Sequence, residues 1–335
     1  MPALPPGSLI VVVGITGYIA CYAGLEALRA GFRIRGTVRD TQRAAALRVA
    51  YEKFGVDASP ENLELVTFDD LGSEAQLEVA FADADGVINL TMPEFDSEDD
   101  YVSRMIDGMM LPLRVAARVP SIKRYVMTST LAAADPQLVG GAPTAEPITE
   151  HAWNDEAVQL YNTLRAAGEK NQWVEYCAGK TLGEKAAWEF IEKNKPTWDL
   201  VTIFPACTWG PVMFGPARTT AQILAGLLEG DPTLCYMRPY TYVDVRDCGK
   251  LHAIAIAEES FGGKRTIAAA GPTNIKEVVD KLKKSFPSAK LPGGPSLEVP
   301  ASKWNIDNAV ATRALDNEWI SVEDAVVETA KSVGY

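Results

Sequence analysis

The chain has 335 residues, of which 47% are hydrophobic, so it can bury a sizeable apolar core. Its formal net charge of −12 disfavours nucleic acids and anionic membranes as partners, because both are negatively charged. The two histidines, His151 and His252, lie far apart and the five cysteines contain no C-x-x-C pair, so we expect neither a metal site nor a disulfide framework. We expect a cytoplasmic protein, since Leu9–Val13 is too short to span a membrane and no basic segment of a signal peptide precedes it.

The first two-thirds of the chain alternates short β-branched segments with longer helical segments, the pattern of a parallel α/β sheet. The expected strands are Leu9–Val13, Arg33–Val38, Leu63–Phe68, Gly86–Leu90, Arg124–Thr128 and Leu200–Phe204. The expected helices are Tyr18–Ala30, Thr41–Phe54, Glu74–Ala82, Asp99–Ala117 and one long helix from about Ala157 or later to Asn194. We predict an α/β fold with a Rossmann-type, doubly wound parallel sheet over residues 1–205. Residues 206–335 are richer in Pro and Gly and are expected to form a smaller, mainly substrate-binding domain, with part of 240–270 returning to the first domain.

A glycine-containing turn follows the first expected strand and opens the first expected helix. It reads Gly14-Ile15-Thr16-Gly17-Tyr18-Ile19-Ala20. Glycines at such a turn let the backbone approach a pyrophosphate, and the helix N-terminus supplies unpaired N–H groups and the positive end of a dipole. We therefore predict that Gly14, Thr16, Gly17, Tyr18 and Ile19 bind a dinucleotide. The alternative is that Gly14 and Gly17 are ordinary turn glycines.

The end of the second expected strand carries a basic residue, in the segment Gly36-Thr37-Val38-Arg39-Asp40. A carboxylate at this place would bind an adenosine ribose and repel a 2′-phosphate, whereas the planar fork of Arg39 suits a phosphate. Arg43, one helical turn further on, could add a second contact. We therefore expect NADP(H). If Arg39 is instead a solvated surface charge and Asp40 contacts the ribose, the cofactor is NAD(H).

An acidic segment, Asp69-Asp70-Leu71, follows the third expected strand. The Asp70 carboxylate could accept a hydrogen bond from an adenine amino group. It could equally cap the helix that follows, and the residues leave both readings open.

Tyr176 and Lys180 are four residues apart in the long expected helix, so their side chains share one helical face. An ammonium group close to a phenol favours the phenolate and lowers the phenol pKa toward the range where a general acid is effective. This pair comes one strand after Thr128-Ser129-Thr130, where a hydroxyl at the end of the strand would face the crevice at the carboxyl ends of the strands.

Together these features resemble the extended short-chain dehydrogenase/reductases. The resemblance is strongest to the branch of dihydroflavonol reductases, cinnamoyl-CoA reductases and fungal aldehyde and ketone reductases. It rests on the glycine turn, Thr37–Asp40, Asp70-Leu71, Tyr176 with Lys180, Phe204-Pro205, Glu150-x-x-Trp153 and Tyr242–Asp247.

The resemblance implies a catalytic group of Thr130, Tyr176 and Lys180, in which Thr130 stands where the family has serine. Ser129 is the fallback, although its side chain should point to the opposite face of its strand. The resemblance also implies that Asp70, Leu71, Leu90, Thr128, Pro205 and Thr208 bind the cofactor. Trp153 and Trp209 are candidate walls of an apolar substrate pocket, with core packing as the alternative.

The expected function is therefore NADPH-dependent reduction of a small aldehyde or ketone, by a monomer or homodimer, with a small-molecule carbonyl substrate as the partner. Two alternatives remain open. One is an NAD-dependent nucleotide-sugar epimerase or dehydratase or a hydroxysteroid-type dehydrogenase. The other is a non-catalytic NADP-sensing protein.

Overall fold

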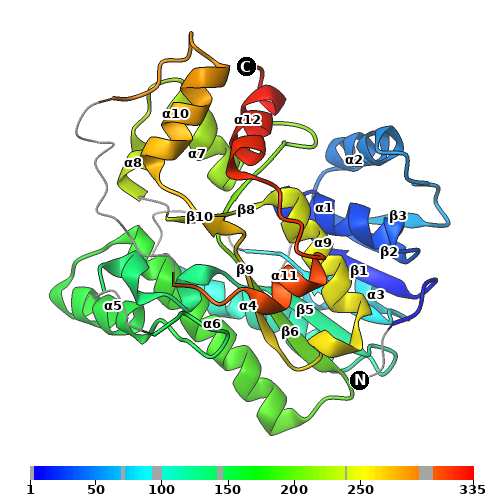
Figure 1. The fold of residues 1–335 in the computed structure, drawn as a ribbon. Coiled ribbons are helices and arrows are strands. Elements are labelled where there is room, and N and C mark those ends of the chain that lie inside the picture. The colour runs from blue at the N-terminus through cyan, green and yellow to red at the C-terminus, as the bar shows by residue number, and fades with distance from the viewer. Residues whose placement is uncertain (1–3, 69–71, 93–99, 142–145, 238–239, 294–304) are drawn as a thin grey trace.

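A seven-stranded parallel sheet forms the centre of the molecule and has helices on both faces (Figure 1). The structure is a computed structural model that describes residues 4–68, 72–92, 100–141, 146–237, 240–293 and 305–335. The strands are β1 (Leu9–Val13), β2 (Arg33–Val38), β3 (Leu63–Thr67), β4 (Gly86–Asn89), β5 (Arg124–Thr128), β6 (Asp199–Pro205) and β9 (Arg265–Ala268). They lie in the order β3-β2-β1-β4-β5-β6-β9, so the strand order reverses between β1 and β4, where ligands bind in open sheets of this kind. The predicted Rossmann-type sheet is confirmed.

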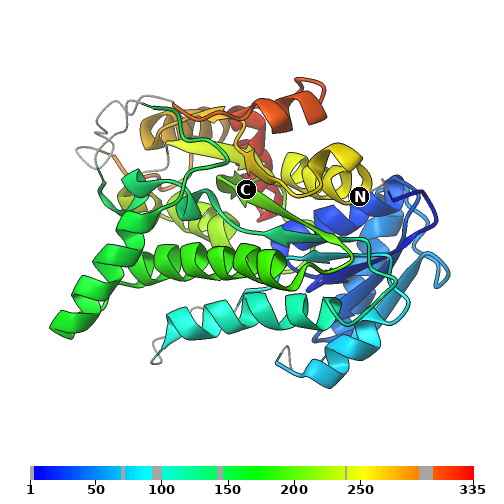
Figure 2. The same cartoon turned by 90° about the horizontal axis from the view of Figure 1, so that it is seen from below.

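The apolar residues of β1 show why this segment becomes a central strand. Ile10 and Val12 pack on one face of the sheet, while Val11 and Val13 pack on the other. A strand that is buried on both faces must be apolar at every position. The first face carries α1 (Tyr18–Arg29), α2 (Thr41–Lys53) and α9 (Val245–Ala257); the second carries α3 (Glu74–Phe81), α4 (Tyr101–Ala116) and α6 (Gln172–Asn194). Figure 2 shows α4 and α6 running side by side beneath the sheet.

The long helix expected from about Ala157 or later to Asn194 begins at Gln172, as α6, and the separate helix α5 (Asp155–Ala167) that precedes it was not predicted. Gly168 ends α5 with a φ of 72°, a left-handed conformation that glycine adopts without steric cost. Asn171 then begins α6 by accepting hydrogen bonds from two backbone N–H groups of its first turn.

The chain beyond β6 builds a smaller lobe around a three-stranded sheet. Its strands are β7 (Cys207–Trp209), β8 (Thr241–Asp244) and β10 (Gly271–Pro272), and its helices are α7 (Thr219–Leu228), α8 (Thr233–Met237), α10 (Ile275–Ser285) and α12 (Val322–Ser332). Between β8 and β10 the chain returns to the large sheet as α9 and β9, and α11 (Ala309–Ala314) packs beside them. Among the described helices, none combines the length and the apolar character needed to cross a membrane.

A buried ion pair joins α6 to the large sheet. The Glu184 carboxylate of α6 is fully buried and lies 2.8 Å from the guanidinium Nε of Arg265 on β9. It also accepts hydrogen bonds from Ser129 (2.5 Å) and Thr202 (2.8 Å), which follow β5 and lie in β6. A buried carboxylate without such partners would be very unfavourable, so these contacts determine how α6 sits on the sheet.

We expect Arg265→Met to lower the free energy of unfolding by about 3–5 kcal/mol, because the Glu184 carboxylate then stays buried without its counter-charge. Urea denaturation measures this loss. The matched control is Lys276→Met, which removes an exposed ion pair with Asp280 and should change stability by less than about 1 kcal/mol. Equal effects of the two substitutions would contradict the structural role of Arg265.

Candidate active site

The glycine turn after β1 has the geometry of an anion site. Gly14 has a φ of 73°, and a Cβ added there would lie 3.0 Å from the Thr91 methyl group, so the turn needs glycine. Gly17 occupies the N-cap of α1, no side chain caps this helix, and no acidic residue lies in its first turn. The first N–H groups of α1, including those of Tyr18 and Ile19, therefore remain available to a negatively charged ligand.

The acidic and basic residues after β2 have different roles. The Asp40 side chain caps α2 by accepting from the Gln42 N–H at 2.7 Å, which engages its carboxylate in the helix. Arg43 donates from Nη2 to the carbonyl oxygen of Thr16 at 2.7 Å and so joins α2 to the glycine turn. Its Nε is buried and has no hydrogen-bond partner among the described residues. Arg39 follows β2 directly.

Tyr176, Lys180 and Glu184 follow one another at four-residue intervals on the sheet-facing side of α6. Tyr176 hydrogen-bonds with the side chain of Thr130 just beyond β5. Lys180 donates from Nζ to the backbone carbonyl of Thr128 at 3.3 Å. Ser129, between these two threonines, points the other way and donates to Glu184. Thr130 rather than Ser129 therefore lies with Tyr176.

Burial dominates the acid–base properties of this pair. It raises the pKa of Tyr176 to about 12, and the hydrogen bond with Thr130 opposes that change. Burial likewise lowers the pKa of Lys180 to about 8, while the negative charge of Glu184 raises it. The pKa of Tyr176 thus moves opposite to the lowering expected from Lys180. The phenol keeps its proton at neutral pH, which suits a proton donor.

Thr128 takes part in two hydrogen bonds on different sides of β5. Its carbonyl accepts from Lys180, while its hydroxyl lies 2.7 Å from Nε2 of His252 in α9. The other ring nitrogen of His252 lies 2.7 Å from the Cys248 carbonyl, which can only accept, so the proton is assigned to Nδ1 and Thr128 donates to Nε2. The buried imidazole is neutral, since burial lowers its pKa to about 4. The Thr128 hydroxyl is thus used in a hydrogen bond to His252.

The remaining cofactor candidates lie at the carboxyl ends of strands or in the small lobe. Leu90 directly follows β4, and Pro205 is the last residue of β6. Thr208 is buried in β7, where its hydroxyl donates to the Ala206 carbonyl at 3.0 Å. Asp70 and Leu71 lie outside the described residues.

The two tryptophans proposed as pocket walls have other surroundings. The Trp153 ring lies 3.5 Å from the Arg265 guanidinium and also faces the Lys185 ammonium at 5.2 Å. Trp209 is fully buried in the core of the small lobe and stacks on Tyr242. The contacts of Trp209 favour its core-packing alternative, whereas Trp153 is only half-buried and its place in a pocket wall stays a prediction.

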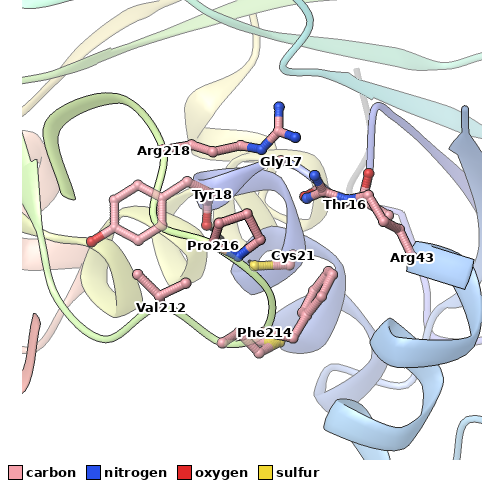
Figure 3. A pocket seen from close by; sticks show the side chains of 10 residues that line it. Thr16, Gly17, Tyr18, Cys21, Arg43, Val212, Phe214, Pro216 and Arg218 are labelled. Carbon is pink, nitrogen blue, oxygen red and sulfur yellow. Dashed lines mark hydrogen bonds between the residues drawn. The ribbon is translucent and has the colours of Figure 1, made fainter. Parts of the chain in front are cut away.

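Two features of the site were missed in the sequence. Trp173, one helical turn before Tyr176, stacks on its ring with centroids 5.3 Å apart, and that spacing could have indicated the contact. The second feature is a pocket at the start of α1, where Arg43 meets Phe214 and Arg218 from the small lobe (Figure 3). No local pattern marks Arg218, because it follows Arg43 by a long stretch of chain.

Known proteins were compared with the whole chain. No family model matches it. Aldehyde reductase 2 of Sporidiobolus salmonicolor is 30% identical over 345 residues, which cover 98% of this chain and 97% of that protein. Cinnamoyl-CoA reductase CAD2 of Medicago truncatula is 27% identical over 332 residues, or 98% and 96% of the two chains.

Among solved structures, yeast methylglyoxal/isovaleraldehyde reductase Gre2 complexed with NADPH superposes with a TM-score of 0.80 at 23% identity, covering 97% of this chain and 98% of that one. This similarity shows the shared fold. With the full-length match to the aldehyde reductase, the glycine turn and the Tyr176–Lys180 pair in their expected places, the chain belongs to the extended short-chain dehydrogenase/reductase family.

Proposed function

We propose that this protein is an NADP(H)-dependent reductase that converts a small aldehyde or ketone to the alcohol. The observation that carries the proposal is the meeting of Tyr176, Thr130 and Lys180 at the carboxyl end of β5. These residues come from α6 and from the segment at the end of β5, and the hydrogen bond from Ser129 to Glu184 holds the two elements together. Two hydroxyls and one ammonium at the ligand-binding edge of such a sheet suit polarisation and protonation of a carbonyl oxygen.

The residues of the glycine turn fit a nicotinamide dinucleotide. The uncapped start of α1 offers N–H groups to a pyrophosphate, and the orphaned Nε of Arg43 is a donor that still needs an acceptor. Arg39 and Arg43 would hold a 2′-phosphate, which is the basis for proposing NADP(H) rather than NAD(H). When bound, the cofactor supplies the hydride that reduces the carbonyl carbon.

In the proposed reaction, Tyr176 donates its phenolic proton to the carbonyl oxygen, so that hydride and proton together give the alcohol. Thr130 hydrogen-bonds the same oxygen and steadies the negative charge that develops on it. Lys180 holds the cofactor ribose and places a positive charge beside Tyr176, which stabilises the phenolate left after proton transfer.

The relatives favour reduction over the alternative reactions. The aldehyde reductase and the cinnamoyl-CoA reductase align over nearly the whole chain, and both names describe reductases. A protein that only senses the cofactor would need no Tyr–Lys pair, and here the pair is kept in contact with Thr130 and with the Thr128 carbonyl.

Tyr176→Phe keeps the ring and its stacking on Trp173 but removes the donated proton. We expect NADPH binding and folding to survive while kcat falls by about a hundred- to ten-thousandfold. NADPH oxidation with a panel of small aldehydes measures the rate. Tyr236→Phe, on an exposed side chain of α8, is the control and should behave like the parent. A folded Tyr176→Phe protein within a few-fold of parental activity would refute the catalytic role.

We expect the parent protein to bind NADPH about ten- to a hundredfold more tightly than NADH, because a charge-assisted contact to phosphate contributes roughly 1.5–3 kcal/mol. Arg39→Asp should abolish or invert this preference by repelling the 2′-phosphate. Titration of cofactor fluorescence measures both affinities. Equal affinity of the parent for the two cofactors would rule out the NADP(H) assignment.

Thr130 and Ser129 should respond differently to substitution. Thr130→Ser should keep activity, whereas Thr130→Ala should lose about a hundredfold in kcat, since a hydroxyl that stabilises developing charge is removed. Ser129→Ala should instead lower stability by about 1–3 kcal/mol, because Glu184 loses a buried hydrogen bond. Rates and urea midpoints of the three variants separate the roles. If Thr130→Ala keeps its activity while Ser129→Ala is stable but loses activity, then Ser129 and not Thr130 has the catalytic role.

A further inference from the structure

Two arginines from different lobes face one pocket at the start of α1. Figure 3 shows the side chains of Arg218 and Arg43 extending toward the same space beside Gly17. Arg43 comes from α2 on the large sheet, and Arg218 comes from the loop that leads into α7 of the small lobe. We propose that Arg218 binds the pyrophosphate of the dinucleotide cofactor from the small lobe. This inference rests on the proposed function.

The loop that carries Arg218 is tied to α1 and α12 by hydrogen bonds within the protein. The Tyr18 hydroxyl donates to the carbonyl of Gly210 at 2.6 Å, and the Tyr22 hydroxyl donates to the carbonyl of Pro211 at 3.0 Å. On its other side, the N–H of Val212 donates to Ser332 of α12 at 2.8 Å. The start of the loop is therefore held between α1 and α12, which brings it across the N-terminus of α1.

Backbone strain occurs directly after Arg218. Thr219 has a φ of 51°, in the left-handed region that a β-branched residue rarely occupies. Conformations of this kind persist where the surrounding structure demands them, and they gather at ligand sites. Arg218 itself is the N-cap of α7, and its side chain does not cap that helix. The strained turn thus directs a charged side chain into the pocket instead of back onto its own helix.

Of the residues that the structure describes, two arginines and no acidic residue line the pocket. Among the described residues, neither Arg43 nor Arg218 forms an ion pair with a carboxylate, although acidic residues outnumber basic ones in a chain of net charge −12. The pKa of Arg43 is lowered by burial, then by the nearby positive charges of Arg218 and Arg39. A fixed cluster of like charges is unfavourable until an anion enters it, so the pocket is prepared for one.

The position of Arg218 distinguishes between the two phosphate groups that the cofactor carries. A 2′-phosphate would lie at the end of β2, where Arg39 is, and Arg43 of α2 reaches from there into the pocket that Arg218 lines. Arg218 instead shares a pocket with Thr16, Gly17 and Tyr18, at the helix start where a pyrophosphate binds. The pyrophosphate is common to NADPH and NADH, so Arg218 contributes to the affinity for both, whereas Arg39 contributes to the affinity for NADPH.

The test is a fluorescence titration of the full chain with NADPH and with NADH. Arg218→Met should weaken the binding of both cofactors by a similar factor, on the order of ten- to a hundredfold. Arg39→Met should weaken the binding of NADPH by such a factor and change the affinity for NADH by no more than about twofold. Arg313→Met, an exposed arginine of α11, is the matched control and should bind both cofactors as the parent does. A thermal melt of each variant verifies that it is folded.

Three outcomes would overturn the assignment of Arg218. Unchanged affinity of Arg218→Met for both cofactors shows that it contacts neither phosphate group. If Arg218→Met loses affinity for NADPH alone, Arg218 contacts the 2′-phosphate instead of the pyrophosphate. A parent protein that binds neither cofactor removes the proposed function itself, and this is recognised before any variant is measured.

Discussion

The buried carboxylate of Glu184 binds side chains of the large sheet, and these contacts fix the position of α6 at the candidate active site. Glu184 is fully buried, and its oxygens are engaged by Arg265, Ser129 and Thr202 from three neighbouring strands or their ends. Because an unpaired charge is so unfavourable there, α6 cannot slide or rotate without losing these contacts. Tyr176 and Lys180 lie two turns and one turn earlier on the same helix face. The ion pair therefore determines where the phenol and the ammonium meet the end of β5.

The same guanidinium connects the site to the segment before α5. Arg265 donates to the carbonyl oxygens of Glu150 and Ala152, and its planar face lies against Trp153. The Glu150-x-x-Trp153 motif, on which the family resemblance partly rests, thus packs on a structural arginine here. In this chain Trp173 stacks on Tyr176, the proposed proton donor.

The local charge at the proposed cofactor site is positive, whereas the net charge of the protein is negative. A surface with a net charge of −12 repels an anionic cofactor at long range. At short range, the start of α1 and the side chains of Arg39, Arg43 and Arg218 replace that field by a local positive one. These charges come from both lobes. A ligand between them would join the large sheet to the small lobe.

Local signals in the sequence were sufficient for β1 to β6, the glycine turn and the opposite orientations of Ser129 and Thr130, whereas β7 to β10 were not predicted as strands. Those signals were sufficient because a buried strand needs a continuous apolar run, and side chains alternate along it. The break at Gly168 was missed, since the helical pattern continues on both sides of it. Tertiary structure alone decided the partners of charged side chains. Arg265 reaches Glu184 across 81 residues, and Arg218 reaches the pocket of Arg43 only because a tethered loop crosses α1. Such pairs depend on how distant elements pack, and residue type and spacing along the chain do not determine that.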